Sequence, residues 1–418
     1  MMDSRAAWVM PMTSPERNRI NSLDFIRGVA ILCILLINIE SFAYPNPWGI
    51  YQYGFMTDID SEVRYWVYVF AQGKFYGLLA MLFGAGLTII LQKQPFEFAI
   101  KLSAARLVAL FILGLVHAYC IWSGDILYHY AVIGMIATTV ILLGTRAIKV
   151  SIVICLAFML VAGFGRAERT NAQYDAYQAA LNVDEVSRTR DQQKAINRWQ
   201  NKTEPRTPTH RTLEETPSLT EYWQKNFDSS QVHKGKLFYS SIFWSTLMMM
   251  LIGSQLFQWG LFSKTKLSPL TVVALLCLIA VSCYATQARY FHWLHSSHIP
   301  VLSYAKQMVI VLNRELQAIV YLVLLSLLYN RWLHRFKPLE AINQVGRFAL
   351  SNYIGQSLLL VVIFYGFGLH NTLSRSELLF LWLAIMAVQL LLNVIYGRFF
   401  KVGPVERVWR KLTIKLYA

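Results

Sequence analysis

Ten stretches of mainly apolar residues recur along the chain, separated by short polar segments. A helix needs about 20 apolar residues to cross the roughly 30 Å hydrocarbon core of a bilayer. Hydrophobic residues make up 56% of the chain and charged residues only 15%, which excludes an ordinary soluble domain. The sequence therefore predicts an all-α polytopic integral membrane helix bundle with about ten transmembrane helices. The predicted spans lie within residues 19–47, 63–91, 106–122, 125–143, 148–164, 237–260, 268–286, 304–329, 348–368 and 378–400.

The first predicted span carries polar side chains among its apolar ones. Asp24 and Arg27 are three residues apart and Arg27 and Asn38 are eleven apart, so all three project from one helical face. A charged side chain within hydrocarbon costs roughly 2.5 kcal/mol or more, so this face is expected to point into the bundle or toward a wet cavity. The alternative for Asp24 and Arg27 is an ion pair at the membrane edge.

The distribution of Lys and Arg predicts the orientation, because short cytoplasmic loops carry an excess of both. With a cytoplasmic N-terminus, the short outer loops hold only Arg64, Arg289 and Arg375. The inner loops and the C-terminal tail hold Lys93, Lys101, Arg106, Arg146, Lys149, Lys264, Lys266, Arg331, Arg335, Lys337, Arg347, Arg398, Lys401, Arg407, Arg410, Lys411 and Lys415. We therefore expect both termini in the cytoplasm, and we attribute the net charge of +16 to topology and not to nucleic-acid binding.

A change in composition divides the chain. Residues 166–236 are polar and rich in Arg, Gln, Thr and Pro, and with the orientation above they form an extracytoplasmic insertion. Its first part, about residues 174–199, is predicted to be helical, whereas Pro205, Pro208 and Pro217 predict a loop in its second part. The flanking domains are an N-terminal transmembrane bundle over residues 1–165 and a C-terminal one over residues 237–418.

The second predicted span has a face of small residues, against which another helix can pack closely. These residues are Gly73, Gly77, Ala80 and Gly84. Lys74 lies beside this face. We expect it either to extend toward the membrane interface or to place a positive charge in the same outer cavity as Asn38.

The third and fourth predicted spans form an antiparallel pair, because only residues 123–124 join them. His117 shares a helical face with Arg106 and is the one histidine expected deep within a span, so it is the candidate for proton transfer. Asp125 follows the turn and can orient it. The alternatives are an interior histidine with a structural role and an aspartate that only caps the next helix.

Other polar residues in the predicted spans are candidates for substrate binding or for hydrogen bonds between helices. Asn352 and Gln356 lie four residues apart on one face of the ninth span, and Arg314 and Glu315 are adjacent charges in the eighth. The residues predicted to bind substrate are Asn352 and Gln356 together with Lys74, Trp122 and Tyr130. No metal is expected, because the three histidines of the FHWLHSSHIP segment have no carboxylate or cysteine beside them.

Several motifs carry a resemblance to a known family. They are SLDFIRGVAILCILLINI, GKFYGLLAMLFGAG, LGLVHAYCIWSGDILYHYAVIG, GRFALSNYIGQSLL, FYGFG and GPVERVWR. In this order they resemble the YeiB-like family of uncharacterised bacterial inner-membrane proteins, over nearly the whole chain outside the insertion. The resemblance implies a multi-pass protein of the bacterial inner (cytoplasmic) membrane.

The DFIRG segment followed by Asn38 is more distantly similar to the heparan-alpha-glucosaminide N-acetyltransferase and acyltransferase-3 proteins of the transmembrane acyltransferase superfamily. Those proteins move an acyl group from cytoplasmic acyl-CoA to an acceptor on the far side. The resemblance implies that Asp24, Arg27 and Asn38 line the acyl-CoA tunnel. The chain departs from the pattern in one respect, because residues 41–50 contain no histidine where those transferases carry one.

The leading hypothesis is an acyltransferase with acyl-CoA as co-substrate and an envelope glycan or lipid as acceptor. His117 would act as the base oriented by Asp125, and Asn38 would hold the thioester oxygen. Arg27, Arg106 and Arg347, with Asp24, would form the CoA site. The alternatives are a transporter of a small solute or lipid and a non-enzymatic lipid-binding scaffold. Membrane lipids are expected partners, nucleic acid is not, and a homodimer is an open alternative to the monomer.

Overall fold

The computed structural model describes residues 20–45, 54–203, 217–235, 241–263, 268–294 and 304–417, and this part of the chain is entirely helical or irregular. The all-α prediction is confirmed. The α-helices are α1 Asn21–Ala43, α2 Asp58–Phe70, α3 Lys74–Lys93, α4 Phe96–Cys120, α5 Leu127–Leu142, α6 Thr145–Leu181, α7 Arg190–Thr203, α8 Leu219–Gly235, α9 Ser241–Gln258, α10 Pro269–Leu294, α11 Tyr304–Arg331, α12 Glu340–Arg347, α13 Ala349–Val361, α14 Arg375–Phe399 and α15 Pro404–Tyr417.

Seven helical segments among the described residues are long and apolar enough to cross a membrane, so the chain is a multi-pass membrane protein. They are Asn21–Ala43, Asp58–Lys93, Phe96–Cys120, Thr145–Leu181, Leu312–Arg331, Ala349–Gly366 and Arg375–Phe399. The other three of the ten predicted spans correspond to the helices α5, α9 and α10, which are not among these seven segments of the described residues.

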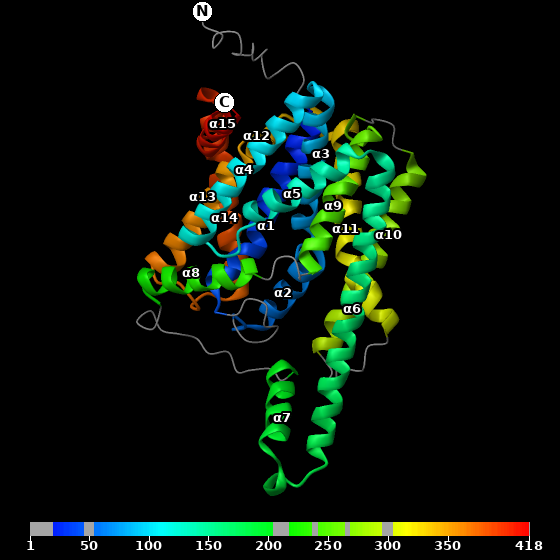
Figure 1. Cartoon of the computed structure of the whole chain (residues 1–418). Helices are drawn as coiled ribbons and strands as arrows, with labels where there is room; N and C mark the ends of the chain where they lie inside the picture. Colours follow the sequence, from blue (N-terminus) through cyan, green and yellow to red (C-terminus); the bar gives the residue numbers. More distant parts are fainter. Residues whose placement is uncertain are drawn as a thin grey trace, which may run out of the picture.

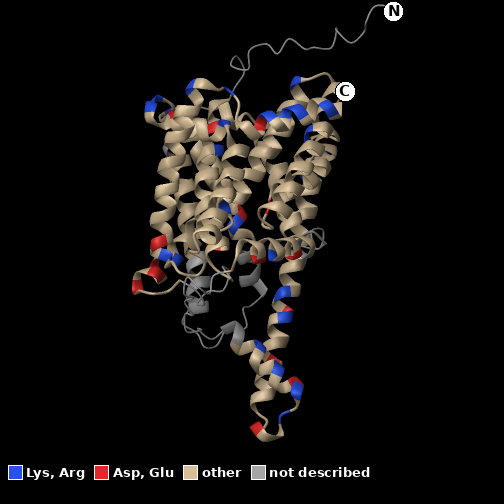
Figure 2. Cartoon of the chain, turned by 90° about the vertical axis from the view of Figure 1, so that its left-hand side faces the viewer, with Lys and Arg blue, Asp and Glu red and all other residues tan. Residues whose placement is uncertain are grey.

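The helices pack as a bundle around α1 (Figure 1). The most apolar part of α1 is 72% buried, against 22% for α6 and α14, which lie at the periphery. The start of α1 and helix α15 lie at the same end of the bundle, and Figure 2 shows Lys and Arg residues gathered there. We call this the basic end. Helices α6 and α7 project from the opposite end.

The second predicted span is interrupted, and its prediction as one continuous helix was wrong. Helix α2 ends at Phe70, and Gly73, with φ of +79°, precedes the start of α3. The freed carbonyl groups of Val69 and Phe70 accept hydrogen bonds from the side chains of Gln317 and Tyr321 on α11, at 3.2 and 3.1 Å. Such partners allow a helix to break within a membrane, where water is absent.

The prediction of a loop in the second half of the insertion was wrong for residues 219–235, which form α8. Helix α6 continues to Leu181, α7 follows, and α8 then occupies Leu219–Gly235. Pro217 lies just before α8, where proline does not disturb a helix. Pro205 and Pro208 lie outside the described residues.

The predicted small-residue face of α3 packs against α9. A Cβ atom at Gly84 would lie 1.8 Å from the carbonyl oxygen of Met250, and one at Gly253 would lie 1.9 Å from that of Met81. The two backbones therefore touch through a reciprocal pair of glycines, a contact typical of membrane helices.

Replacing Gly84 by alanine should destabilise the bundle, because the added methyl group would push α3 away from α9. Overpacking of this kind costs about 1–3 kcal/mol. The measurement is the unfolding temperature of the purified protein in nanodiscs. Gly86→Ala is the matched control, since a Cβ there would meet no atom within 4 Å. Equal unfolding temperatures for the two variants would contradict the contact.

Candidate functional site

His117 and Asp125 form a buried pair. The Nδ1 of His117 donates to Oδ1 of Asp125 at 2.8 Å, and each side chain is 1% exposed. The other oxygen of Asp125 accepts the backbone N–H of Tyr128 at 2.7 Å. Asp125 therefore both orients the histidine and caps the first turn of α5. The connection between α4 and α5 covers residues 121–126, longer than the predicted two-residue turn.

The open nitrogen of His117 faces the protein interior. Because the carboxylate can only accept, Nδ1 carries the proton and Nε2 of the neutral ring is left as an acceptor. Nε2 is buried and has no hydrogen-bond partner in the described part of the chain. The ring centroid lies 5.1 Å from that of Tyr353 on α13, whose hydroxyl accepts the N–H of Ile126 at 3.2 Å. Tyr353 is thus held against the imidazole.

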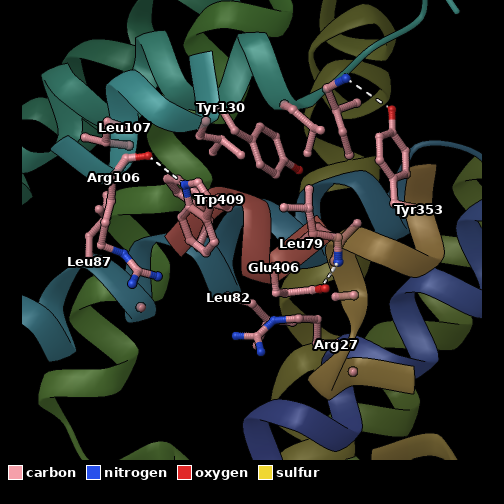
Figure 3. A pocket seen from close by; sticks show the side chains of 18 of the residues that line it. Arg27, Leu79, Leu82, Leu87, Arg106, Leu107, Tyr130, Tyr353, Glu406 and Trp409 are labelled. Carbon is pink, nitrogen blue, oxygen red and sulfur yellow. Dashed lines mark hydrogen bonds between the residues drawn. The ribbon is translucent and has the colours of Figure 1, made fainter. Parts of the chain in front are cut away.

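A cavity of about 580 Å³ runs from the basic end to Tyr353. Its lining includes Arg27 of α1, Arg106 of α4, Arg347 of α12 and Arg410 of α15. Figure 3 shows the guanidinium groups of Arg27 and Arg106 on one side of this space and the rings of Tyr130 and Tyr353 on the other. The wall between them is apolar and includes Leu79, Leu82, Phe83, Leu107 and Leu110. The cavity fits a ligand with an anionic part and an apolar part.

The positive charge of the cavity is only partly compensated. Arg27 donates to Asp24 at 3.0 Å, whereas Arg106, Arg347 and Arg410 have no carboxylate at ion-pair distance among the described residues. The guanidinium of Arg106 lies 4.1 Å from the ring of Trp409, and that ring donates its N–H to the backbone oxygen of Arg106 at 2.9 Å. These contacts hold Arg106 in place without neutralising it.

Among the described residues that line the cavity, Glu406 is the one that is acidic. Its Oε1 accepts the backbone N–H of Leu350 at 2.8 Å, and its Oε2 is hydrogen-bonded by the hydroxyl of Ser351. Glu406 therefore caps the start of α13 and is not at ion-pair distance from Arg106, Arg347 or Arg410. Four residues of this site were not predicted from the sequence, namely Tyr353, Glu406, Trp409 and Arg410. The last three stand in the GPVERVWR motif, which was the available signal.

The structure brings together some of the predicted site residues. Arg27, Arg106, Arg347 and Tyr130 line the cavity, Asp24 is ion-paired to Arg27, and His117 and Asp125 lie behind Tyr353. The ion pair of Asp24 and Arg27 also matches the simpler alternative for these two residues.

Other predicted site residues lie away from the cavity. Asn38 is half-buried on α1 and is not part of the cavity lining. Lys74 is 3% exposed at the α2–α3 break and donates to the backbone oxygen of Tyr68 at 2.6 Å. The ring of Trp122 packs 5.1 Å from that of Phe42.

Asn352 and Gln356 join helices. Asn352 donates to Asn393 of α14 at 2.9 Å, and Gln356 donates to the backbone oxygen of Ile31 of α1 at 3.1 Å. Gln356 also donates to Gln389 of α14 at 2.9 Å. These contacts match the alternative in which both residues form hydrogen bonds between helices.

A cluster of buried charges at the opposite end was missed. Glu40 of α1 is paired with Arg64 of α2 at 3.1 Å and with Arg375 of α14 at 3.0 Å. Both arginine side chains are at most 2% exposed, and the two residues lie within α2 and at the first residue of α14 instead of in loops. His129 and His370 are also buried, so His117 is not alone in this respect.

The three histidines considered for a metal site contribute nothing further. His295 and His298 lie outside the described residues. Within the described ranges, three or more His, Cys, Asp or Glu residues do not come together in a group that could hold a metal ion.

Comparisons with known proteins identify the relatives of the chain. It is 31% identical to the uncharacterised protein YeiB of Escherichia coli K12, covering 96% of this chain and 97% of YeiB. It is 24% identical to the uncharacterised protein YxaH of Bacillus subtilis 168, covering 94% of each. An uncharacterised 39.9 kDa protein of Bacillus acidopullulyticus is also 24% identical, with the same coverage. No solved structure matches.

Residues 251–415 match the family described as "Protein of unknown function (DUF418)". The chain therefore belongs to the DUF418 family and is a homologue of YeiB.

Proposed function

We propose that the protein is a membrane acyltransferase that takes an acyl group from acyl-CoA and passes it to an acceptor hydroxyl or amine. One observation carries this proposal. A single cavity joins a cluster of arginines at the basic end to Tyr353, and a buried His117–Asp125 pair lies directly behind that ring. The arginines suit the phosphate groups of CoA, and the apolar wall suits its acyl chain.

In the proposed reaction, Nε2 of His117 takes the proton from the acceptor as the acceptor oxygen or nitrogen attacks the thioester carbon. The tetrahedral intermediate collapses with cleavage of the carbon–sulfur bond. The imidazolium then returns its proton to the CoA thiolate, so protons and electrons balance. Asp125 keeps the ring in the tautomer that leaves Nε2 open. Tyr353 has to rotate so that Nε2 can reach the reacting atoms. Asn38 remains the predicted donor to the thioester oxygen.

We place the basic end in the cytoplasm of a bacterial inner membrane, where the positive-inside rule puts Lys and Arg and where acyl-CoA is available. The acceptor would then approach from the opposite side, as an envelope glycan or lipid.

A transporter is the second candidate, favoured by the break between α2 and α3. Interrupted helices often form substrate sites in transporters, and this break lies beside buried Lys74 and next to Arg314, whose side chain approaches Gly73. Solute counterflow into proteoliposomes without acyl transfer would favour this candidate. The scaffold alternative would show neither activity.

His117→Ala should lower the rate of acyl transfer by about 100-fold or more, because a lost general base typically costs this much. Acyl-CoA binding should be retained, since His117 is not part of the cavity lining. The measurements are steady-state transfer from radiolabelled acetyl-CoA and equilibrium binding of CoA. Asp125→Asn should cost less, because Asp125 orients and does not react.

His129→Ala is the control for this prediction. His129 is a buried histidine of the neighbouring helix that is bonded to Thr246 at 3.0 Å and not to Asp125. A His117→Ala protein with full transfer activity, or one no slower than His129→Ala, would rule out the proposed base.

Arg106→Gln and Arg410→Gln should each weaken CoA binding about tenfold or more, because a hydrogen bond to a charged group contributes about 1.5–3 kcal/mol. The Kd can be measured by calorimetry with CoA at low and at high salt. Arg335→Gln is the control, since Arg335 is exposed and is not part of the cavity lining. An unchanged Kd in both cavity variants would contradict the CoA site.

Reporter fusions test the orientation. A reporter at Ala418 should be active on the cytoplasmic side, and one inserted between Leu181 and Arg190, in the projecting α6–α7 hairpin, should be active on the far side. Reporters on the same side of the membrane would contradict the proposed topology.

A further inference from the structure

Helix α8 of the insertion is hydrogen-bonded to the end of α4. The side-chain nitrogen Nδ2 of Asn226 donates to the backbone oxygens of Ala118 and Tyr119 at 3.0 and 3.2 Å. The side-chain oxygen Oδ1 of Asn226 accepts the backbone N–H of Ser123. The hydroxyl of Ser230 also donates to Ala118 at 2.8 Å. The last carbonyl groups of a helix have no partner within it, so α8 provides the partners for α4.

A further bond from α8 reaches the turn that joins His117 to Asp125. The hydroxyl of Tyr222 donates to the backbone oxygen of Ile121 at 2.6 Å. Burial raises the pKa of Tyr222 well above its usual range, so the phenol remains a neutral donor. Since His117 precedes these bonded carbonyls and Asp125 follows them, α8 holds the backbone on which the pair depends.

A second face of α8 is apolar and exposed. Leu219, Trp223 and Phe227 are 37%, 49% and 47% exposed. At about 100° per residue they lie to one side of the face formed by Tyr222 and Asn226. Four exposed polar residues lie to the other side, namely Glu221, Gln224, Lys225 and Asp228. This arrangement is that of a helix at a boundary between water and an apolar phase.

The apolar face continues the lipid-facing surface of α4. The ring of Phe227 lies 5.2 Å from that of Tyr119, and further along α4 the side chains of Ile112 and Val116 are 39% and 53% exposed. Because α4 is a candidate membrane span, lipid has to cover these side chains. Figure 1 shows α8 lying across the bundle, at a large angle to α4 and at the end opposite α15.

We propose that α8 is an interfacial helix that rests on the bilayer surface through Leu219, Trp223 and Phe227 and thereby fixes the turn between His117 and Asp125. The partner is the headgroup and upper acyl region of the lipid, where aromatic side chains are favoured. The lipid contact is independent of catalysis, and only the benefit to acyl transfer rests on the proposed function.

Spin-label accessibility in nanodiscs tests the lipid contact. In a full-length protein without its five cysteines, single cysteines would carry a nitroxide at position 223 or 227, with labels at 224 and 225 as matched controls. Labels in lipid collide more often with oxygen, and labels in water collide more often with a water-soluble nickel chelate. We expect more frequent collisions with oxygen at positions 223 and 227, and more frequent collisions with the nickel chelate at positions 224 and 225. The nickel-dominated pattern at all four positions would overturn the proposal.

Hydrogen exchange tests the link to the turn without any acyl donor. In nanodiscs, the backbone amide hydrogens of residues 118–128 should exchange with solvent faster in the double variant Trp223→Ser, Phe227→Ser than in the wild type. The control Lys225→Ser should not. These side chains are exposed, so loss of folding is not expected. Unchanged exchange in the double variant would overturn the positioning role, whether or not His117 proves to be catalytic.

Discussion

Backbone polar groups at helix ends must find partners inside the protein where water does not reach them, and the architecture of this bundle depends on that constraint. Three helix ends illustrate it. Gln317 and Tyr321 satisfy the carbonyls released where α2 ends, Asn226 satisfies those at the end of α4, and Glu406 accepts the amides at the start of α13. Each partner comes from a segment distant in sequence. The same bonds that complete these helices therefore hold the bundle together.

The two ends of the bundle differ in whether their arginines have a carboxylate at ion-pair distance. At the end opposite α15, Glu40 lies between Arg64 and Arg375, all three side chains are buried, and each arginine is at ion-pair distance from the carboxylate. In the cavity at the basic end, Arg106 and Arg410 have no carboxylate at ion-pair distance among the described residues, and Glu406 is occupied by backbone amides. Arg410 is exposed, whereas Arg106 is half-buried, and a positive charge withdrawn from water without a counter-ion is costly unless an anion binds there. This contrast is the physical reason to regard the cavity as a binding site.

The pair of His117 and Asp125 was predicted from the sequence because both residues lie on one local hairpin, where the separation along the chain limits the separation in space. Arg27 was also identified, since a charge in an apolar segment stands out, and Arg106 and Arg347 were identified as basic residues at the cytoplasmic ends of predicted spans. Tyr353 was not identified as a site residue, because an aromatic residue in an apolar helix gives no sign of what it contacts. Asn352 and Gln356 were proposed for substrate binding, but their polar character is equally suited to the hydrogen bonds between helices that they form.

By itself, the sequence determined that the chain is a bundle of apolar helices, with basic segments between them and a polar insertion in the middle. These properties depend on local composition and periodicity, which bilayer thickness and the cost of burying charge translate directly into helices. Only the tertiary structure decided that four arginines from four helices share one cavity, that α2 and α3 are separate, and that α8 closes the end of α4. Those outcomes depend on hydrogen bonds and side-chain contacts between residues up to several hundred positions apart, and no local pattern specifies such partners.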